Sequence, residues 1–409
     1  MTKGSFGAVA SATTRRGKIA GHEGVGATGP VAGPVMIAAM KILSVVGARP
    51  QFVKLAPVSA AITESGHEHV IVHTGQHYDP ALSAVFFTEL GIPAPDVQLG
   101  VGSGGHGAQT GAMLEALDPV LERYAPDWVL VYGDTNSTLA GAVSAVKQQL
   151  PVAHLEAGLR SFNRRMPEEH NRVLTDHAAD LLLAPTRRAV RNLEVEGLGA
   201  RTALVGDVMV DVCFQARDRA LGGGPDAPVS SPAEGIDPAA PYLVATVHRA
   251  ENTDDPALLE AIIDSLAALP HPVALLAHPR LLARAASHGI ELRRGSIRLG
   301  APLPYQAMVG AVLGSAGVVT DSGGLQKEAY LLGRVCTTLR AETEWPETLV
   351  EGWNVLVPQP IRERALLAEL VTRDVPGTTP GVEYGDGKAA LRVVAELERA
   401  RAHAARRAS

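Results

Sequence analysis

Short apolar runs alternate with longer amphipathic stretches from residue 41 onward, and this alternation constrains the fold more than any other feature. In the first half we expect strands in KILSVVG (41–47), HVIVHTG (69–75), DWVLVYG (127–133), PVAHLEAG (151–158), DLLLAPT (180–186) and TALVGD (202–207). Helices are expected after Pro50 and over residues 80–90. Continuous Val, Leu and Ile runs are typical of strands that helices cover on both faces. The repetition therefore predicts an α/β protein with parallel, doubly wound sheets.

Residues 216–240 interrupt this pattern with a Gly- and Pro-rich stretch that we interpret as a loop. A second series follows, with expected strands at 241–248, 272–278, 296–300, 317–321, 335–339 and 354–358. We therefore predict two Rossmann-like domains, at residues 41–208 and 209–385. A final helix is expected over 388–406, within a C-terminal segment 386–409. Residues 1–40, rich in Ala, Gly, Ser and Thr, are expected to be a disordered extension.

Composition narrows the functions open to such a chain. Its 409 residues carry a formal net charge of -6, whereas general nucleic-acid binders have a basic excess. No apolar run is long enough to span a bilayer, so no membrane partner is expected. Cys213 and Cys336 lie far apart and match no metal-ligand spacing, which predicts no metal site. Two isolated thiols fit a reducing, cytoplasmic location.

Carboxylates follow two of the predicted strands. In open α/β sheets ligands bind beyond the carboxyl ends of the strands, and Asp134 and Glu156 stand there, with Glu168 and Arg172 shortly after. Crowded carboxylates tend to have separated pKa values, which suits one as a base and another as an acid. Simpler interpretations are that Asp134 caps a helix, and that Glu168 and Arg172 form an i, i+4 ion pair.

Several other polar segments suit phosphate. Arg49 and Lys54 place two cations near a predicted helix N-terminus, and Ser322 begins a strand-to-helix turn whose N–H groups would hold an anion. Ordinary loop charges and a capped helix are the competing interpretations. The candidate binding residues are Arg49, Lys54, His248, His278, Arg280, Ser322, Gly323, Gly324, Glu328 and Arg340.

Seven of these segments, taken in order, resemble the non-hydrolysing UDP-N-acetylglucosamine 2-epimerases over about residues 41–395. They are GARPQFVKLAPV, HTGQHYD, YGDTNSTLAG, HLEAGLRS, RRMPEEHNR, TVHRAEN and TDSGGLQKEAYLLG. The resemblance implies the GT-B architecture, with the active site in the cleft between two Rossmann-like domains. It also implies a homodimer, and a last helix that crosses back to the first domain.

The resemblance implies the chemistry as well. No carbonyl acidifies the proton beside the anomeric carbon, so the family eliminates UDP to a 2-acetamidoglucal and then adds UDP back. Asp134, Glu156 and Glu168 resemble the acid/base carboxylates, and which of them takes the first proton stays open. Arg172 lies in the same motif, and His248 would stabilise the departing diphosphate together with Arg49. The residues that would hold phosphate and ribose are Ser322, Gly323 and Glu328.

No cofactor is expected, because the Gly-x-Gly-x-x-Gly fingerprint of dinucleotide sites is absent after the first strand. Three departures from the family pattern bear on substrate and regulation. Gln51 stands where many bacterial members have Glu, and Trp345 where they have Arg, so we expect both to affect sugar specificity. Gln76-His77-Tyr78 lacks the arginine of an allosteric motif, so activation by substrate is expected to be weak or absent.

Four alternatives remain open. The chain would equally suit a 2-epimerase of a modified UDP-sugar such as a UDP-diacetamido-uronic acid, or a hydrolysing epimerase that releases free N-acetylmannosamine. A GT-B glycosyltransferase and a catalytically silent UDP-sugar sensor are the others. The trio Asp134, Glu156 and Glu168 argues against these last two, because neither needs it.

Overall fold

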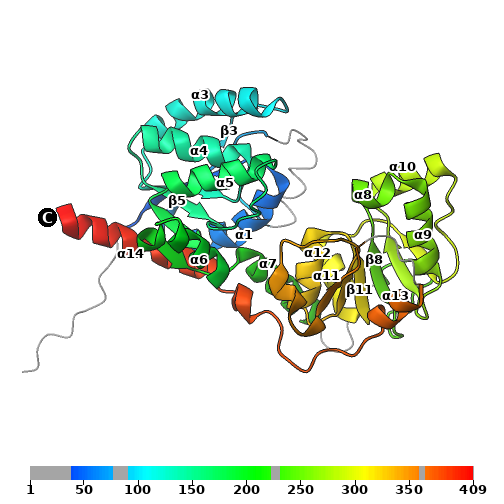
Figure 1. Cartoon of the computed structure of the whole chain (residues 1–409). Helices are drawn as coiled ribbons and strands as arrows, with labels where there is room; N and C mark the ends of the chain where they lie inside the picture. The colour runs from blue at the N-terminus through cyan, green and yellow to red at the C-terminus, as the bar shows by residue number, and fades with distance from the viewer. Residues whose placement is uncertain (1–37, 77–90, 223–230, 359–363, 409) are drawn as a thin grey trace, which may run out of the picture. The chain divides into compact units, whose positions relative to one another are not determined.

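The computed structural model describes residues 38–76, 91–222, 231–358 and 364–408. Within them, two parallel sheets lie inside one compact unit, Ala39–Ser409, and helices cover both (Figure 1). The first sheet has seven strands in the order β3-β2-β1-β4-β5-β6-β7. The second has six in the order β10-β9-β8-β11-β12-β13. Strand order reverses beside β1 and beside β8, which confirms the predicted doubly wound α/β architecture.

The strands are shorter than the apolar runs that predicted them, because the polar ends of each run lie in loops. In the first sheet they are β1 (Lys41–Val46), β2 (Glu68–His73), β3 (Val97–Gln98), β4 (Trp128–Tyr132), β5 (Val152–Leu155), β6 (Leu181–Ala184) and β7 (Thr202–Leu204). In the second they are β8 (Leu243–Thr246), β9 (Val273–Leu276), β10 (Ile297–Gly300), β11 (Gly317–Thr320), β12 (Cys336–Thr338) and β13 (Asn354–Leu356). Of the strands in the described residues, the short edge strand β3 was not predicted.

Helices alternate with these strands. They are α1 (Arg49–Glu64), α3 (His106–Tyr124), α4 (Asn136–Lys147), α5 (Pro167–Ala178), α6 (Arg187–Val195), α7 (Val208–Leu221), α8 (Ala250–Thr253), α9 (Pro256–Ala267), α10 (Pro279–His288), α11 (Tyr305–Gly314), α12 (Gly323–Leu331), α13 (Arg364–Val371) and α14 (Ala389–Ala408). The helix predicted over 80–90 lies outside the described residues, as do His77 and Tyr78. The predicted loop begins later than expected, because α7 continues to Leu221.

Strand β4 shows how the sequence places the two cores of the first sheet. All of its residues are buried. Leu130 and Tyr132 join one apolar cluster, whereas Val129 and Val131 join another. Successive side chains of a strand point to opposite faces, so an uninterrupted apolar run is needed when both faces are covered. This burial holds the carboxyl end of β4, and the residues that follow it, inside the layered structure.

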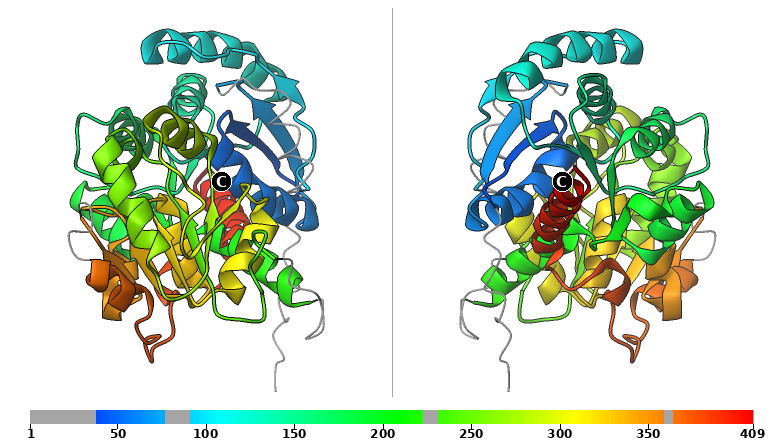
Figure 2. Two further views of the ribbon diagram at one scale, coloured as in Figure 1. Left: turned by 90° about the vertical axis from the view of Figure 1, so that its right-hand side faces the viewer. Right: turned by 90° about the vertical axis from the view of Figure 1, so that its left-hand side faces the viewer.

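The last helix, α14, packs against α1 and α7, and both views of Figure 2 show it alongside α1. Val393 and Leu397 enter the apolar cluster on that face of the first sheet. Asp211 of α7 accepts hydrogen bonds from the N–H groups of Ala389 and Ala390, at 3.0 and 2.8 Å. A carboxylate on the first N–H groups of a helix stabilises its start. The end of the chain is thereby joined to the first sheet.

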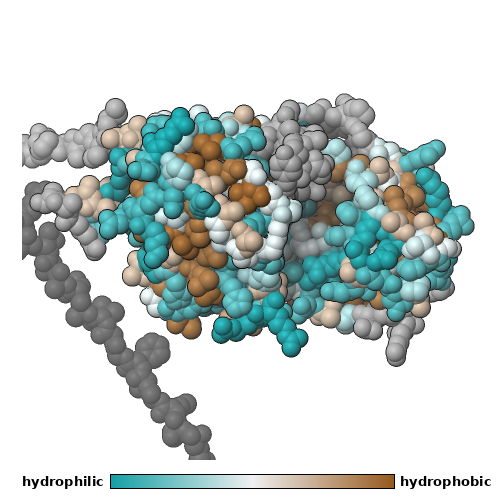
Figure 3. All heavy atoms as spheres, turned by 90° about the horizontal axis from the view of Figure 1, so that it is seen from above, coloured by the Kyte–Doolittle hydropathy of each residue, from teal (hydrophilic) through white to brown (hydrophobic). Residues whose placement is uncertain are grey.

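Apolar residues also reach the surface over the first sheet, on the side of α3 (Figure 3). On this helix Ala112 is exposed, while Leu114 and Val120 are half-buried.

Among the described residues, none of the helices combines the length and the apolar character that a bilayer crossing needs.

Candidate functional site

The turn after β4 places Asp134 at the carboxyl end of the first sheet. Gly133 has φ +64°, in the left-handed region that favours glycine. The Asp134 carboxylate forms an ion pair with Arg172 of α5, and Asn171 donates to the Asp134 carbonyl at 3.0 Å. Thr135, not Asp134, is the N-cap of α4, since its side chain accepts from Thr138. The interpretation of Asp134 as a helix cap is therefore wrong.

The turn after β5 brings Glu156 to the same place. Its Oε2 forms an ion pair with Lys54 of α1, whose side chain is 12% exposed. Burial alone would lower the pKa of Lys54, but the charges of Glu156, Asp134 and Asp207 raise it above its ordinary value. A Cβ built on Gly133 would meet Glu156 Oε2 at 3.1 Å and Lys54 Nζ at 3.4 Å. The two carboxylates therefore flank one glycine, and each has its own cation.

Helix α5 contributes two adjacent carboxylates with different surroundings. Glu169 accepts from the N–H groups of Ser161 and Phe162, both at 2.9 Å, and from Arg172 at 2.7 Å. Burial would raise the pKa of Glu169, but these hydrogen bonds hold it below its ordinary value. Glu168 is half-buried and has no hydrogen bond or ion pair within the described part of the chain. The prediction of an ion pair between Glu168 and Arg172 is wrong. Arg172 instead pairs with Glu169, three residues before it, and this i, i+3 spacing could have indicated the pair from the sequence.

In the second sheet, the buried residue Asp321 organises the loop after β8. It accepts hydrogen bonds from the backbone N–H groups of His248 and Arg249, both at 2.9 Å, and from Asn252 at 3.0 Å. Burial would raise the pKa of Asp321, but these contacts hold it low. His248 Nδ1 lies 3.0 Å from the ionised carboxylate and must carry a proton, which leaves Nε2 of the half-exposed ring for a ligand.

Asp321 was not among the predicted site residues. Asp321 follows β11 and Asp134 follows β4. A carboxylate after the end of a strand therefore indicated a site residue in both cases.

The start of α12 has the form that was expected of an anion site. Ser322 is the N-cap, and its Oγ accepts from Leu325 N at 3.3 Å. Gly323 opens the helix and Gly324 is exposed, and the first N–H groups of a helix have no acceptor within it. Glu328, further along α12, is half-buried, and burial raises its pKa.

Of the remaining candidates, His278 lies beside His248, with 5.6 Å between their ring centroids. Its Nδ1 accepts from the N–H group of Arg280 at 3.2 Å, at the start of α10. The Arg280 side chain forms an ion pair with Asp254. Arg49 is the first residue of α1.

Arg340 forms a bidentate ion pair with Glu344, with N–O distances of 2.7 and 2.8 Å. In this structure, then, neither Arg280 nor Arg340 presents a guanidinium that lacks a carboxylate partner.

The two residues that were expected to affect sugar specificity are engaged inside the protein. The Gln51 side chain is buried, accepts from the N–H groups of Gly47 and Ala48, and donates to the carbonyl of Tyr132 at 2.9 Å. The ring of Trp345 packs against the Lys327 ammonium, 3.9 Å from the ring centroid. Gln51 therefore holds the turn after β1, and a glutamate there would lack the N–H that Tyr132 receives.

Substituting Gly133 with Ala should disrupt the carboxylate cluster. The methyl group would press on the ion pair of Glu156 with Lys54, and a non-glycine residue at φ +64° is strained by roughly 1 kcal/mol. Because displacement of reacting groups by about 1 Å costs on the order of a hundredfold in rate, we expect turnover to fall by tenfold or more. Steady-state kinetics checks this, with Gly104→Ala as the control because a Cβ there meets nothing within 4 Å.

Two parallel-sheet Rossmann-like domains of the GT-B type, with cation-paired carboxylates after neighbouring strands, define a class of nucleotide-sugar enzymes. Within that class, the chain belongs to the UDP-N-acetylglucosamine 2-epimerase family, whose model matches residues 60–398. It is 44% identical to the UDP-2,3-diacetamido-2,3-dideoxy-D-glucuronate 2-epimerase of Pseudomonas aeruginosa, over 88% of this chain and 99% of that one.

Two further relatives carry the name of the family itself. The UDP-N-acetylglucosamine 2-epimerase of Escherichia coli is 31% identical, over 88% of this chain and 98% of its own. The Methanocaldococcus jannaschii UDP-GlcNAc 2-epimerase has been solved in complex with UDP-GlcNAc and UDP. That structure is 36% identical with a TM-score of 0.73, covering 88% of this chain and 100% of that chain. The relatives named here are thus all 2-epimerases of UDP-sugars.

Proposed function

We propose that the protein interconverts UDP-N-acetylglucosamine and UDP-N-acetylmannosamine in the cleft between its two Rossmann-like domains. The observation that carries this proposal is the pair of carboxylates around Gly133. Asp134 and Glu156 come from neighbouring strand ends, and each faces a cation, Arg172 or Lys54. Proton removal from one face of a sugar and proton delivery to the other require two acid/base groups at one site, and these carboxylates supply two.

The proposed reaction balances without an oxidant. One carboxylate takes the proton from C2, the C1–O bond breaks, and its electron pair leaves with the β-phosphate of UDP. The resulting 2-acetamidoglucal then receives a proton at C2 on the opposite face, and the UDP oxygen attacks C1. We assign proton transfer to Asp134, Glu156 and Glu168. Glu168 qualifies because it has no partner within the described residues, whereas Glu169 is occupied by Ser161, Phe162 and Arg172.

UDP must stay bound while its bond to the sugar is broken. We assign the diphosphate to His248, held by Asp321, together with Arg49 and the start of α12 at Ser322 and Gly323. Fixed donors stabilise charge most where it develops, which here is on the leaving diphosphate. Glu328 is assigned to the ribose. Arg280 or Arg340 would contact UDP only by exchanging its carboxylate partner for phosphate.

A second candidate substrate is UDP-2,3-diacetamido-2,3-dideoxy-D-glucuronate. The relative that carries this name is 44% identical to the chain along nearly its whole length. The same carboxylates would serve, because the chemistry at C1 and C2 does not change. The pocket would differ only where it meets the C3 acetamido group and the C6 carboxylate. Gln51 donates to the Tyr132 carbonyl and Trp345 lies on Lys327, and neither contact distinguishes the two sugars.

Incubation with each UDP-sugar in deuterated water tests the proposal. An epimerase acting on UDP-N-acetylglucosamine yields its C2 epimer with deuterium at C2 and no lasting loss of UDP, as followed by NMR. Release of free N-acetylmannosamine would assign a hydrolysing reaction instead. Exchange with the diacetamido-glucuronate alone would assign the second substrate, and exchange with neither would contradict the proposal.

We also propose that the protein acts as a homodimer, which the family resemblance supports. Sedimentation equilibrium at micromolar concentration should give twice the chain mass of 42.7 kDa. A monomer mass under these conditions would contradict this expectation.

A further inference from the structure

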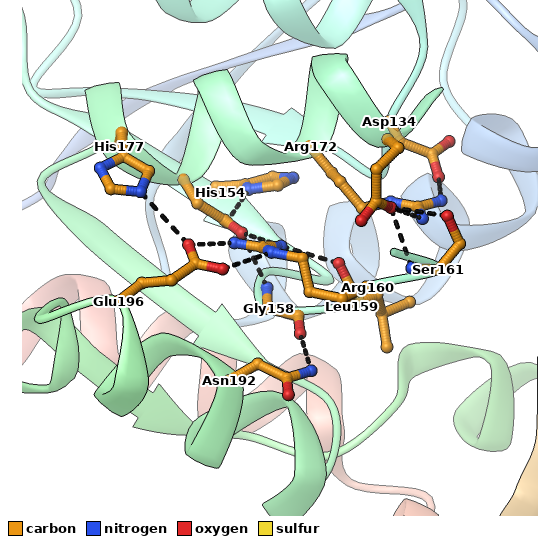
Figure 4. A network of polar contacts seen from close by, with 12 residues as sticks. Asp134, His154, Gly158, Leu159, Arg160, Ser161, Arg172, His177, Asn192 and Glu196 are labelled. Atoms are coloured by element: carbon orange, nitrogen blue, oxygen red, sulfur yellow. Dashed lines mark hydrogen bonds and ion pairs between the residues drawn. The ribbon is translucent and has the colours of Figure 1, made fainter. Parts of the chain in front are cut away.

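A buried histidine connects the two turns that present the carboxylates. His154 lies in β5 and is fully buried. Its Nε2 is 2.7 Å from the carbonyl oxygen of Gly133, the residue before Asp134, and its Nδ1 is 2.7 Å from Asp176 of α5. Figure 4 shows the contacts around His154 and, in the same view, the separate ion pair of Asp134 with Arg172. The His154 side chain therefore connects β5 to the turn after β4.

Both ring nitrogens of His154 face oxygen atoms at hydrogen-bond distance. A carbonyl oxygen and an ionised carboxylate can both accept hydrogen bonds but cannot donate them. Burial would raise the pKa of Asp176, but the charges and hydrogen bonds of His154 and Arg160 hold it below its ordinary value, so it is ionised. Each ring nitrogen of His154 therefore faces an oxygen, and Arg160 lies 2.7 Å from the other oxygen of Asp176. A ring held from both sides in this way has a fixed plane and fixes the position of the groups it contacts.

Asp176 also reaches the turn that carries Glu156. Its Oδ2 accepts from the N–H group of Gly158 at 3.1 Å. Glu156 itself has φ +74°, a left-handed conformation that is strained for a residue with a side chain. The N–H groups of Glu156 and Ala157 both point to the carbonyl of Leu183, at 3.1 and 3.2 Å. These hydrogen bonds hold the strained turn in place. Asp176 accepts the last of them, from Gly158.

We propose that His154 and Asp176 are positioning residues for the epimerase reaction, bridging the turn of Asp134 to the turn of Glu156. The proposal rests on the proposed function, because it assigns a purpose to the spacing of those two carboxylates. The other residues of β5 are apolar, and an apolar side chain in place of a buried ion pair is often no less stable. The ring instead connects two turns whose side chains must stay within about 1 Å of a working geometry.

Two amide substitutions of His154 separate its two contacts. The shorter amide in His154→Asn matches Nδ1 and can still reach Asp176, but it falls short of Gly133. The longer amide in His154→Gln matches Nε2 and can still donate to the Gly133 carbonyl. We expect His154→Gln to keep kcat within about threefold of the wild type, and His154→Asn to lower it by roughly ten- to a hundredfold. KM and the stoichiometry of UDP binding should be unchanged in both variants.

These readouts distinguish positioning from folding. A purely structural role would lower the UDP-binding stoichiometry and kcat together, because part of the sample would be misfolded. That result, or equal values of kcat in the two variants, would overturn the proposal.

An NMR measurement tests, independently of turnover, whether His154 connects Gly133 to Asp176. In the wild type, the ¹⁵N signals of the His154 ring should show a proton on Nε2, which faces the Gly133 carbonyl. The amide signals of Gly133 and Asp134 should move in His154→Asn and stay close to the wild type in His154→Gln. A ring without a proton on Nε2, or signals that move equally in both variants, would overturn the bridge. If wild-type protein exchanged deuterium into no UDP-sugar, the proposed function alone would fail, and these shifts would still decide the bridge.

Discussion

The Glu156→Gln variant is expected to lose at least about a hundredfold in turnover while UDP binding stays nearly intact. Glutamine keeps the size of the side chain and an oxygen that accepts from Lys54, so the ion pair becomes a hydrogen bond. It cannot take or deliver a proton at C2 of the sugar. The diphosphate is assigned to His248, Ser322 and Arg49, none of which is altered by this change, so UDP binding should be kept.

Turnover is measured by NMR under the conditions of the deuterium experiment, and UDP affinity by titration calorimetry. Glu122→Gln is the matched control, because Glu122 is an exposed carboxylate on α3. Near-normal turnover in Glu156→Gln would remove Glu156 from the proton-transfer residues and leave Asp134 and Glu168 as the candidates.

Replacing Asp207 with Ala is expected to lower the free energy of unfolding by about 3–5 kcal/mol, the usual result when one partner of a buried ion pair is removed. Asp207 pairs with Lys327 of α12, and the two side chains are 3% and 5% exposed. Without this carboxylate, the Lys327 ammonium would lose its ion-pair partner and keep the faces of Trp345 and Tyr384, 3.9 and 5.3 Å away. The variant also loses the N-cap of α7, where Asp207 accepts from Met209 at 2.8 Å.

Urea unfolding followed by tryptophan fluorescence measures this effect, since Trp345 lies on Lys327. The control is the double variant Asp207→Leu with Lys327→Met, which replaces both charges by apolar side chains. It should be clearly more stable than Asp207→Ala, because no charge is left buried alone. A loss below about 1 kcal/mol in Asp207→Ala would show that water reaches Lys327 and that the pair contributes little.

The same pair predicts how stability depends on pH. Burial would raise the pKa of Asp207, but the charge of Lys327 and the hydrogen bonds from Lys327 and Met209 hold it below its ordinary value. A depressed folded-state pKa stabilises the protein above the unfolded-state value, near 4, and this contribution is lost as the pH falls through the folded-state pKa. The wild type should therefore lose stability in acid more steeply than the double apolar variant. Equal acid slopes would contradict the assignment.

Several site residues could be predicted from the sequence because they depend on local pattern. Uninterrupted apolar runs indicate strands covered on both faces, and parallel strands bring their carboxyl ends to one edge of a sheet. Asp134, Glu156 and His248 all follow such runs, and the structure finds them in the turns after β4, β5 and β8. The same pattern would have pointed to Asp321, which follows β11.

Choices between neighbouring residues required the structure. Glu168 and Glu169 are equivalent as sequence, yet the rotation of α5 buries Glu169 against Ser161 and leaves its neighbour half-exposed. Gln51 looks like a substituted site residue, but in the structure its amide donates to the carbonyl of Tyr132, at the end of β4. A one-residue step around a helix is about 100°, so a small rotation decides which side chain reaches the site.

The sequence by itself determined the parallel sheets and the turns where carboxylates and cations gather, because periodicity records which faces of an element are buried. Only the tertiary structure decided which charges are partners. His154 meets Asp176 across 22 positions, and Lys327 meets Asp207 across 120. Such contacts form where separate elements pack, and the cost of burying a charge is offset only by a partner that the packing supplies. No local pattern contains that information.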